Sequence, residues 1–329
     1  MAVDTEAIGK VHRALFPEYG PTPLVSLPAL AKELGCKEVY VKDESERYGL
    51  PAFKVLGASW GLCRLLGERY GVEPWDIAAI KGRVKTEPKL GVYTATDVAR
   101  TAKLLGPPAF IYVPSTVEQW SIDAIASEGC EVKKVERDYD GAIAAALEAC
   151  NAADGLMVQD MSWEGYEDVP AWIVDGYTTI CREAASEVKA TGVVVPVGVG
   201  SLAHAVAKFY GPEGPDHARI VSAEPEAAPC LAESLKAGKP VSITESSFTI
   251  MPGLNCGTVN PQAWPDLQLY IRPEDAVVVN DNEALTAASD LQALGVNAGP
   301  CGAATLAAAR KVEWKANDVV VLICTEGKQ

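Results

Sequence analysis

Strand-like and helix-like segments alternate through the middle of the chain, and this alternation limits the possible folds more than any other feature. Between residues 90 and 160, short apolar runs such as AFIYVP alternate with longer segments of helical apolar spacing such as VARTAKLLG. Strands and helices in this order are typical of a parallel sheet that is covered by helices on both faces. We therefore expect an α/β fold.

A glycine-containing loop follows a β-branched strand in residues 193–210, VVVPVGVGSLAHAVAKFY. At such a loop the backbone N–H groups and the positive end of the next helix converge, and glycine lets a phosphate approach the backbone. The spacing of Gly198, Gly200 and Ala203 also fits a dinucleotide fingerprint, with Glu224 about 20 residues onward to accept a ribose hydroxyl. The loop predicts an anion site, and an NAD-linked oxidoreductase is one alternative.

Length and charge restrict the class of protein. A chain of 329 residues is long for one domain, so two lobes are expected. The net charge of -15 argues against nucleic acid or an anionic membrane surface as a partner. No apolar stretch approaches the length that a membrane-spanning helix needs.

The cysteines and histidines do not predict a metal site. The nine cysteines are odd in number and contain no CxxC pair, and the three histidines, at 12, 204 and 217, are far apart in the sequence. Reduced thiols fit this pattern better than disulfides, and the first residues lack the apolar core of a secretory leader. We therefore expect a cytoplasmic protein.

Lys54 is the candidate nucleophile. It follows Pro51, Ala52 and Phe53 and opens a run of helical apolar spacing, VLGASWGLCRLLGERY. Apolar neighbours and a helix N-terminus both disfavour an ammonium ion, and a neutral lysine amine attacks carbonyl carbon. From these residues alone, a surface lysine whose stem covers apolar surface is the alternative.

Lys54 lies in a segment with a distinctive set of residues, namely KDES at 42–45, Arg47, GL at 49–50, AFK at 52–54, Gly57 and Ser59. Further motifs along the chain are PTPL at 21–24, TATD at 94–97, WEGY at 163–166, TIMPGLNCG at 249–257, GPCG at 299–302 and CTEG at 324–327. Together these motifs resemble those of the tryptophan-synthase-β-like (fold type II) pyridoxal phosphate enzymes, and in particular the diaminopropionate ammonia-lyases among them.

The resemblance implies a fold and a division of the chain. It implies two lobes, each an open, mostly parallel sheet flanked by helices. Residues 1–57 and 168–329 would form the large cofactor-binding domain, and residues 58–167 would form the small domain.

The resemblance also implies a cofactor site for pyridoxal phosphate. Lys54 would hold the cofactor as a Schiff base, and Cys324 or Thr325 would lie near the pyridine nitrogen. A neutral partner there leaves the nitrogen largely unprotonated, which suits elimination. The phosphate would be bound by residues of the glycine loop, namely Gly198, Val199, Gly200, Ser201, Leu202 and Ala203.

Asp97 matches the aspartate that serves as a second base in diaminopropionate ammonia-lyases. A lysine on one face of the cofactor removes the α-proton of one enantiomer, so the other enantiomer requires a base on the opposite face. A helix N-cap is the alternative role for this aspartate. The resemblance places the substrate pocket at Ser45, Asp160, Tyr166 and Asn255.

The function implied is a pyridoxal phosphate-dependent α,β-elimination, by a carbon–nitrogen lyase that converts 2,3-diaminopropionate to pyruvate and ammonia. A homodimer is expected, with a small amino acid as its ligand. The alternatives are another β-substituted amino acid, a β-replacement reaction, or a family member without catalytic activity.

One family element is absent from the sequence. Family members carry an asparagine loop of the form ATDGNHG, whereas here Asp97 runs directly into Val98 and the helix that follows. Either the loop is deleted, which removes a cofactor contact, or residues are missing from the recorded sequence.

Overall fold

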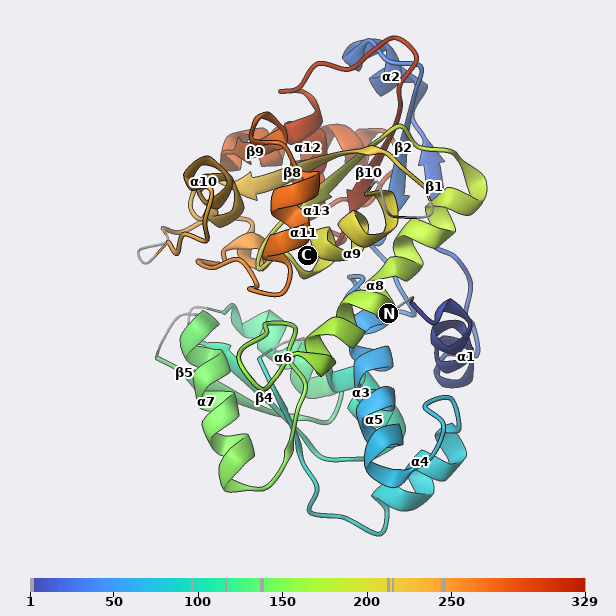
Figure 1. Ribbon diagram of the computed structural model, residues 1–329, viewed down its shortest axis with the longest axis vertical. Coiled ribbons are helices and arrows are strands. Elements are labelled where there is room, and N and C mark those ends of the chain that lie inside the picture. Colours follow the sequence, from blue (N-terminus) through green and yellow to red (C-terminus); the bar gives the residue numbers. More distant parts are fainter. Residues whose placement is uncertain are drawn as a thin grey trace. The chain divides into compact units, whose positions relative to one another are not determined.

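The computed structural model describes residues 3–95, 98–115, 117–136, 139–211, 214, 216–243 and 247–328. The chain divides into two compact units (Figure 1). Unit 1 contains residues 1–19 and 54–176, and unit 2 contains residues 20–53 and 177–329. Each unit is built around its own sheet, as an α/β chain with two lobes requires.

The sheet of unit 2 has six strands in the order β1-β2-β10-β7-β8-β9. β1 runs antiparallel to β2, and every other neighbouring pair is parallel. The register places Cys324 opposite Asp43, so β2 and β10 end at the same level. The strands are β1 (Leu24–Ser26), β2 (Glu38–Asp43), β7 (Gly192–Pro196), β8 (Arg219–Pro225), β9 (Ala276–Val279) and β10 (Val319–Cys324).

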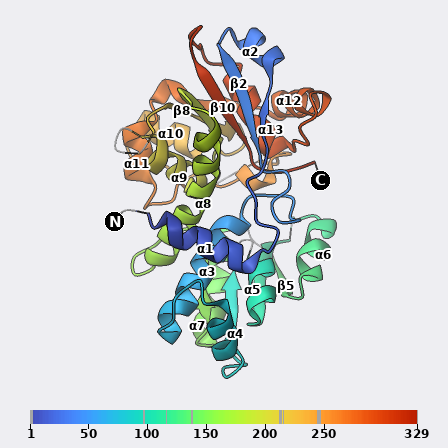
Figure 2. The ribbon, with the colours of Figure 1, turned by 90° about the vertical axis from the view of Figure 1, so that its right-hand side faces the viewer.

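Helices cover both faces of this sheet. In Figure 2, α12 and α13 lie on one face, and α8, α9 and α10 lie on the other. This arrangement follows from right-handed crossovers, because the chain moves one way along the sheet from β7 to β9 and then returns to β10. The helices are α2 (Pro28–Leu34), α8 (Asp168–Glu187), α9 (Ser201–Tyr210), α10 (Cys230–Ala237), η1 (Pro252–Leu254), α11 (Trp264–Tyr270), η2 (Pro273–Asp275), α12 (Asp281–Ala293) and α13 (Pro300–Ala309).

The main core of unit 2 lies around α13. All residues of this helix from Cys301 to Ala309 are buried, and most of them are alanine or glycine. Small side chains let the helix pack closely between the sheet and α12, where larger ones would not fit at native packing density.

The sheet of unit 1 has four parallel strands in the order β5-β4-β3-β6. These are β3 (Val92–Thr94), β4 (Ala109–Pro114), β5 (Glu131–Val135) and β6 (Leu156–Met157). The helices are α1 (Thr5–Leu15), α3 (Val55–Tyr70), α4 (Ile77–Val84), α5 (Ala99–Leu105), α6 (Gln119–Ser127), α7 (Tyr139–Ala152) and the first half of α8.

The alternation of strands and helices is confirmed, and the two-lobed, mostly parallel architecture is the one expected. The domain bounds differ from the predicted ones. The predicted large domain includes residues 1–19, whereas these residues lie in unit 1, where α1 packs on α3 and α4 and the His12 Nε2–H donates to the Leu56 carbonyl at 3.0 Å. The unit boundaries fall at 19/20, 53/54 and 176/177, and the last of these lies inside α8.

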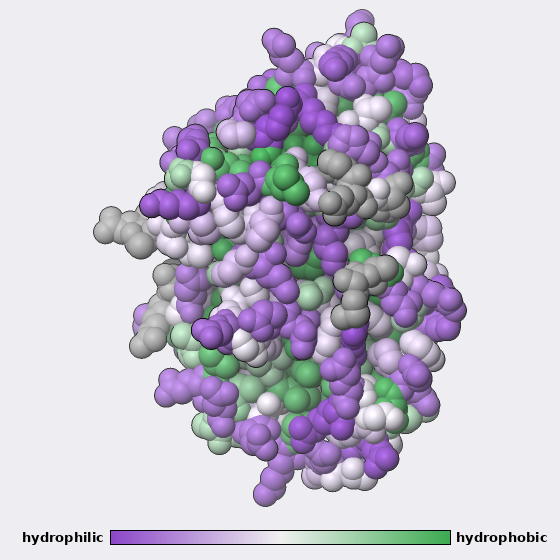
Figure 3. Space-filling view, in the orientation of Figure 1, coloured by the Kyte–Doolittle hydropathy of each residue, from purple (hydrophilic) through white to green (hydrophobic). Residues whose placement is uncertain are grey.

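Among the described residues, no helix is long and apolar enough to cross a membrane. Hydrophilic side chains cover much of the face drawn in Figure 3, and smaller apolar areas lie among them.

Gly176 should be intolerant of a side chain. It lies where α8 crosses α3, and a Cβ there would lie 2.5 Å from the Leu56 carbonyl oxygen and 2.8 Å from the Gly57 Cα. Because both neighbours are backbone, Gly176→Ala should lower the free energy of unfolding by about 1–3 kcal/mol. Denaturant unfolding followed by circular dichroism measures this change.

Gly82→Ala is the matched control within unit 1. Gly82 lies in α4, and a Cβ there would meet no atom within 4 Å. Alanine should therefore raise the free energy of unfolding by roughly 0.5–1 kcal/mol. Equal effects of the two substitutions would contradict the close approach of α8 and α3.

A buried carboxyl group joins β8 to α10. The Leu231 and Ala232 N–H groups, in the first turn of α10, each donate to Glu224 at 2.7 Å. Complete burial raises the pKa of Glu224 to about 7, although these hydrogen bonds favour the ionised form. In the folded protein the group therefore holds its proton to a higher pH than in the unfolded chain.

This raised pKa predicts a loss of stability as the pH rises. The contribution of Glu224 is fully present below its unfolded pKa of about 4.5 and is lost as the pH passes through about 7. From pH 5 to pH 8, the free energy of unfolding of the wild type relative to Glu224→Gln should fall by about 2–3 kcal/mol. A difference that stays constant between these pH values would refute the assignment.

Candidate functional site

The parallel strands of unit 2 bring several of the predicted site residues to one edge of the sheet. Ser45, Gly198 and Thr325 each follow the end of a strand, β2, β7 and β10 respectively, by one or two residues. The three strands are parallel and lie in the order β2-β10-β7. We call this the carboxyl edge, which is where open α/β sheets bind ligands.

The glycine loop passes from β7 into α9 at the carboxyl edge. Gly200 has a φ of 97°, in the left-handed region, and is the N-cap of α9. The Asn260 N–H, which belongs to a different loop, donates to the Val199 carbonyl at 2.7 Å and so helps to fix the glycine loop. Among the described residues no side chain caps α9, so the positive helix end at its first turn, Ser201 to Ala203, is of the kind that binds anions.

A second loop packs against the glycine loop. A Cβ on Gly198 would lie 2.9 Å from the Gly253 carbonyl oxygen and 3.1 Å from Cys256 Sγ, so only glycine fits there. Asn255 lies between these neighbours, and its Nδ2 donates to the Ser247 carbonyl at 3.2 Å. Its Oδ1 is buried, with no hydrogen-bond partner in the part of the chain that the structure describes.

The end of β10 is joined to the segment that leads to Lys54. The Phe53 N–H donates to the Thr325 carbonyl at 3.4 Å, and the Gly327 N–H donates to the Pro51 carbonyl at 3.1 Å. The Cys324 thiol is buried and donates to the Glu326 carbonyl at 3.5 Å. The segments 51–53 and 325–327 therefore form a short antiparallel pair beside two predicted site residues.

Ser45 lies against the same turn. Its N–H donates to Asp43 Oδ1 at 2.9 Å, and a Cβ on Gly327 would lie 3.3 Å from the Ser45 Cβ. The glycine of the CTEG motif thus lets the end of β10 approach the residues that follow β2.

Lys54 begins unit 1 and is the N-cap residue of α3. Its carbonyl accepts the Ala58 N–H at 3.1 Å, and its side chain is half-buried. The lysine therefore stands at the start of a helix, as the sequence predicted. The next residue toward the N-terminus, Phe53, is the one hydrogen-bonded to Thr325.

In unit 1, the Gln159 side chain holds the end of β3. Its Oε1 accepts the Ala95 N–H at 3.0 Å, and its Nε2 donates to the Asp160 carboxylate at 2.9 Å. The Tyr166 hydroxyl accepts the Gln159 N–H at 2.8 Å and donates to backbone carbonyls. Two predicted pocket residues, Asp160 and Tyr166, thus lie around the strand that leads to Asp97. Asp97 itself lies outside the described residues.

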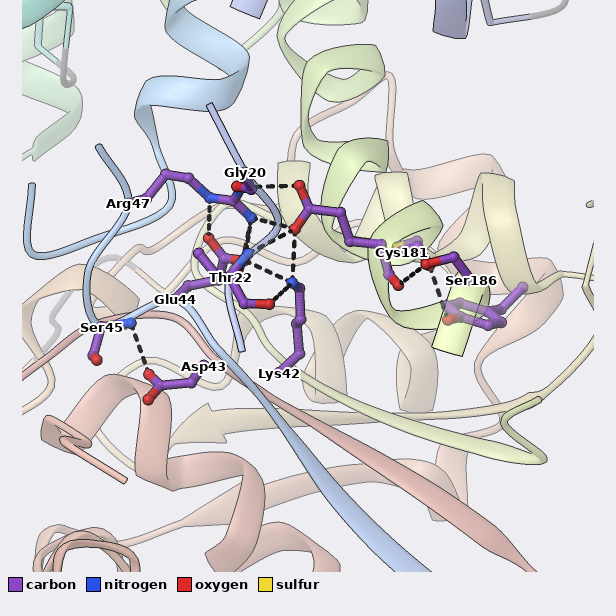
Figure 4. A network of polar contacts seen from close by, with 11 residues as sticks. Gly20, Thr22, Lys42, Asp43, Glu44, Ser45, Arg47, Cys181 and Ser186 are labelled. Carbon is purple, nitrogen blue, oxygen red and sulfur yellow. Dashed lines mark hydrogen bonds and ion pairs between the residues drawn. The ribbon is translucent and has the colours of Figure 1, made fainter. Parts of the chain in front are cut away.

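Unit 2 also contains a buried cluster of ion pairs for which sequence reasoning predicts no role. Ion pairs join Lys42 and Arg47 to Glu44 and Glu183, and the Thr22 hydroxyl donates to Glu44; we call these five residues the buried ion cluster (Figure 4). From the sequence, Lys42 and Arg47 are only parts of the motif that contains Lys54. A signal was present, since Lys42 lies in a strand that is otherwise mostly apolar, but nothing local pointed to Glu183 as its partner.

The dinucleotide alternative required Glu224 to accept a ribose hydroxyl. The structure contradicts this role, because Glu224 is fully buried and both of its carboxyl oxygens are bonded to N–H groups of α10. The glycine loop therefore lacks the acidic residue of the dinucleotide fingerprint.

Comparisons with known proteins agree with the motifs. A family model described as pyridoxal-phosphate dependent enzyme matches residues 15–326. Diaminopropionate ammonia-lyase of Escherichia coli (strain K12) is 33% identical over 342 residues, covering 94% of this chain and 85% of that protein. A crystal structure of the E. coli enzyme has a TM-score of 0.85 and 30% identity, covering 98% of this chain and 88% of that one. Maize serine racemase shares the fold, with a TM-score of 0.78 at 21% identity, covering 100% of this chain and 94% of that one.

The alignment with the E. coli protein contains positions that this chain does not fill. It runs over 342 positions, whereas 94% of 329 residues is about 309, so about 33 of its positions have no residue of this chain. The family model nevertheless matches nearly the whole chain, and the fold is that of the fold type II enzymes. The chain therefore belongs to the family of pyridoxal-phosphate dependent enzymes.

Proposed function

We propose that the chain is a carbon–nitrogen lyase that converts 2,3-diaminopropionate and water to pyruvate and two molecules of ammonia. The observation that carries the proposal is the arrangement at the carboxyl edge, where the segment entering Lys54 is hydrogen-bonded to the end of β10. The similarity to the E. coli diaminopropionate ammonia-lyase over 94% of the chain supports the choice of substrate.

The glycine loop fits the phosphate of the cofactor. A chain with a net charge of -15 must attract an anion by local dipoles, and α9 offers its N-terminus without a side-chain cap. A Cβ on Gly198 would press on backbone, so the loop keeps its backbone exposed only with glycine there. The residues that would hold the phosphate are Gly198, Val199, Gly200, Ser201, Leu202 and Ala203.

The end of β10 fits a neutral partner for the pyridine nitrogen. Burial, followed by the negative charge of Asp43, raises the pKa of the Cys324 thiol well above its ordinary value, so this residue stays uncharged. Thr325 is also neutral. When bound, pyridoxal phosphate withdraws electrons from the α-carbon of an amino acid and so makes the α-proton acidic. A neutral contact at the nitrogen moderates that withdrawal and favours elimination.

Two residues of the chain would move protons. Lys54, which we propose also holds the cofactor, would take the α-proton from one face, and Asp97 would take it from the other. Loss of the β-amino group then completes the elimination. With a base on each face, both enantiomers of the substrate would react.

The proposed substrate-contact residues are Ser45 and Asn255 in unit 2, and Asp160 and Tyr166 in unit 1. Asp160 offers a buried carboxylate that could face an ammonium group, and Asn255 offers a buried amide oxygen. The Tyr166 hydroxyl is bonded to backbone groups of residues 157 and 159, so its part would be to shape the pocket.

We also propose that the larger part of the chain, unit 2 with the Lys54 turn, is the cofactor-binding part, and that the protein works as a homodimer in the cytoplasm. The nine cysteines, all within the described residues, form no disulfide, which is in keeping with a reducing compartment.

Lys54→Ala should abolish attachment of the cofactor. The wild type, incubated with pyridoxal phosphate, should show a visible absorption band that borohydride removes, with the cofactor mass on the peptide that contains Lys54. The variant should carry no cofactor mass on this peptide after borohydride, and its turnover should fall by about 10²–10⁴-fold because the base is lost. Absorption spectra and peptide mass mapping make the measurement.

Lys81→Ala is the control, because Lys81 is an exposed lysine of α4 in the same unit. It should behave as the wild type. A folded wild type that takes up no pyridoxal phosphate would instead favour the alternative of a non-catalytic family member, in which the absent asparagine loop has removed an essential contact.

Asp97→Asn should separate the two enantiomers of the substrate. Turnover of one enantiomer should fall by about 10²–10⁴-fold, while the other, deprotonated by Lys54, should be little affected. The measurement is ammonia and pyruvate release from D- and L-2,3-diaminopropionate. Asp154→Asn serves as the control, because Asp154 has a φ of 50° and asparagine tolerates that region. Equal turnover of both enantiomers by the Asp97 variant would mean that the second base is another residue.

A further inference from the structure

The buried ion cluster is almost closed to solvent. The side chains of Lys42, Glu44 and Arg47 are 0% exposed, and that of Glu183 is 9% exposed. Two cations face two carboxylates, so the cluster is neutral as a whole. Lys42 Nζ donates to Glu183 at 2.7 Å and to the Thr22 carbonyl at 2.6 Å.

Arg47 is the centre of the cluster (Figure 4). Its Nε and Nη2 donate to the two oxygens of Glu44 at 2.8 and 2.6 Å. Its Nη1 and Nη2 donate to the two oxygens of Glu183 at 2.9 and 2.8 Å. The guanidinium thus forms a bidentate pair with each of the two carboxylates, which fixes its position and its plane. A lysine could not form both bidentate pairs.

The backbone of Arg47 begins a tight turn. The Arg47 N–H donates to the Leu50 carbonyl at 2.8 Å, and the Leu50 N–H donates to the Arg47 carbonyl at 3.0 Å. Between them Tyr48 has a φ of 56° and Gly49 a φ of 72°. Two successive left-handed residues are the signature of a type I′ turn, which favours Asn-Gly and not Tyr-Gly. The turn therefore contains an unfavourable residue that its surroundings must hold in place.

Beyond the turn the chain enters the site directly. Residues 51–53 pair with residues 325–327 at the end of β10, and the next residue is Lys54. The path from Arg47 to Lys54 is therefore fixed at both ends, by the buried ion cluster at the turn and by β10 at the exit.

We propose that Arg47, held by Glu44 and Glu183, is a positioning residue that fixes the 47–50 turn and thereby the backbone that carries Lys54. The inference rests on the proposed role of Lys54 as the lysine that holds the cofactor. Arg47 acts through the turn and itself touches neither cofactor nor substrate.

The test compares Arg47→Lys with Arg219→Lys in the full-length protein. Arg219 pairs with Asp275, which is 1% exposed, at the opposite end of the same sheet, so its loss should also destabilise unit 2. We measure the melting temperature, the dissociation constant for pyridoxal phosphate from its absorption band, and the fraction of the Lys54 peptide that borohydride labels with the cofactor.

Arg47→Lys should weaken pyridoxal phosphate binding by about 10- to 100-fold and lower the labelled fraction, because a small displacement of a reacting group is enough to cause such losses. Arg219→Lys should lower the melting temperature without either effect. If the two variants weaken cofactor binding equally, Arg47 has only a structural role and the inference is wrong.

A third variant distinguishes an effect of Arg47 that acts through the turn from an effect on overall stability. Tyr48→Asn places the preferred Asn-Gly pair in the turn. Combined with Arg47→Lys, it should recover at least part of the cofactor affinity, whereas combined with Arg219→Lys it should change the affinity little. Absence of recovery would show that Arg47 does not act through the turn. Failure of the wild type to label at Lys54 would instead overturn the proposed function, so the two failures are distinguishable.

Discussion

The hydrogen bonds between residues 51–53 and 325–327 are the constraint on which the site in unit 2 depends. They join a segment that lies near the start of the chain to the last strand, and they do so where β2 and β10 end level with each other. These two segments can meet because β2 and β10, which they follow, run parallel, so that the carboxyl ends of both strands lie at one edge of the sheet. The parallel sheet thus determines which loops can share a site.

Glycines then determine how closely those loops approach. At Gly198 and Gly302 an added Cβ would press on neighbouring backbone or on a cysteine sulfur, and at Gly327 it would press on Ser45. Each contact brings one loop of the carboxyl edge against another with no side chain between them. The exposed backbone that results suits the binding of an anion by N–H groups, in a chain whose overall charge repels anions.

Features with local causes were predictable from the sequence, and features that depend on distant partners were not. The strand, glycine loop and helix of residues 193–210 follow from β-branched residues and glycine, and they lie where predicted. Gly35 ends α2 at a φ of 70°, in the left-handed region that glycine favours, so this helix end also has a local cause. By contrast, Glu224 matched a dinucleotide pattern because the spacing was right, yet its oxygens are bonded to a helix that the sequence did not predict.

The same reasoning explains why the buried ion cluster had no counterpart in the prediction and why it is retained in the fold. Glu183 is 136 residues from Arg47, so no local pattern joins them. Burial would raise the pKa of Glu183, but hydrogen bonds from Arg47 and Lys42 lower it below its ordinary value, so the charged form is the stable one. Apolar residues of the same volume could stabilise the unit equally well. They could not, however, fix the direction of a turn, because packing is less directional than two bidentate pairs. The backbone before Lys54 requires a directional constraint, because Tyr48 in the 47–50 turn would otherwise leave the left-handed region.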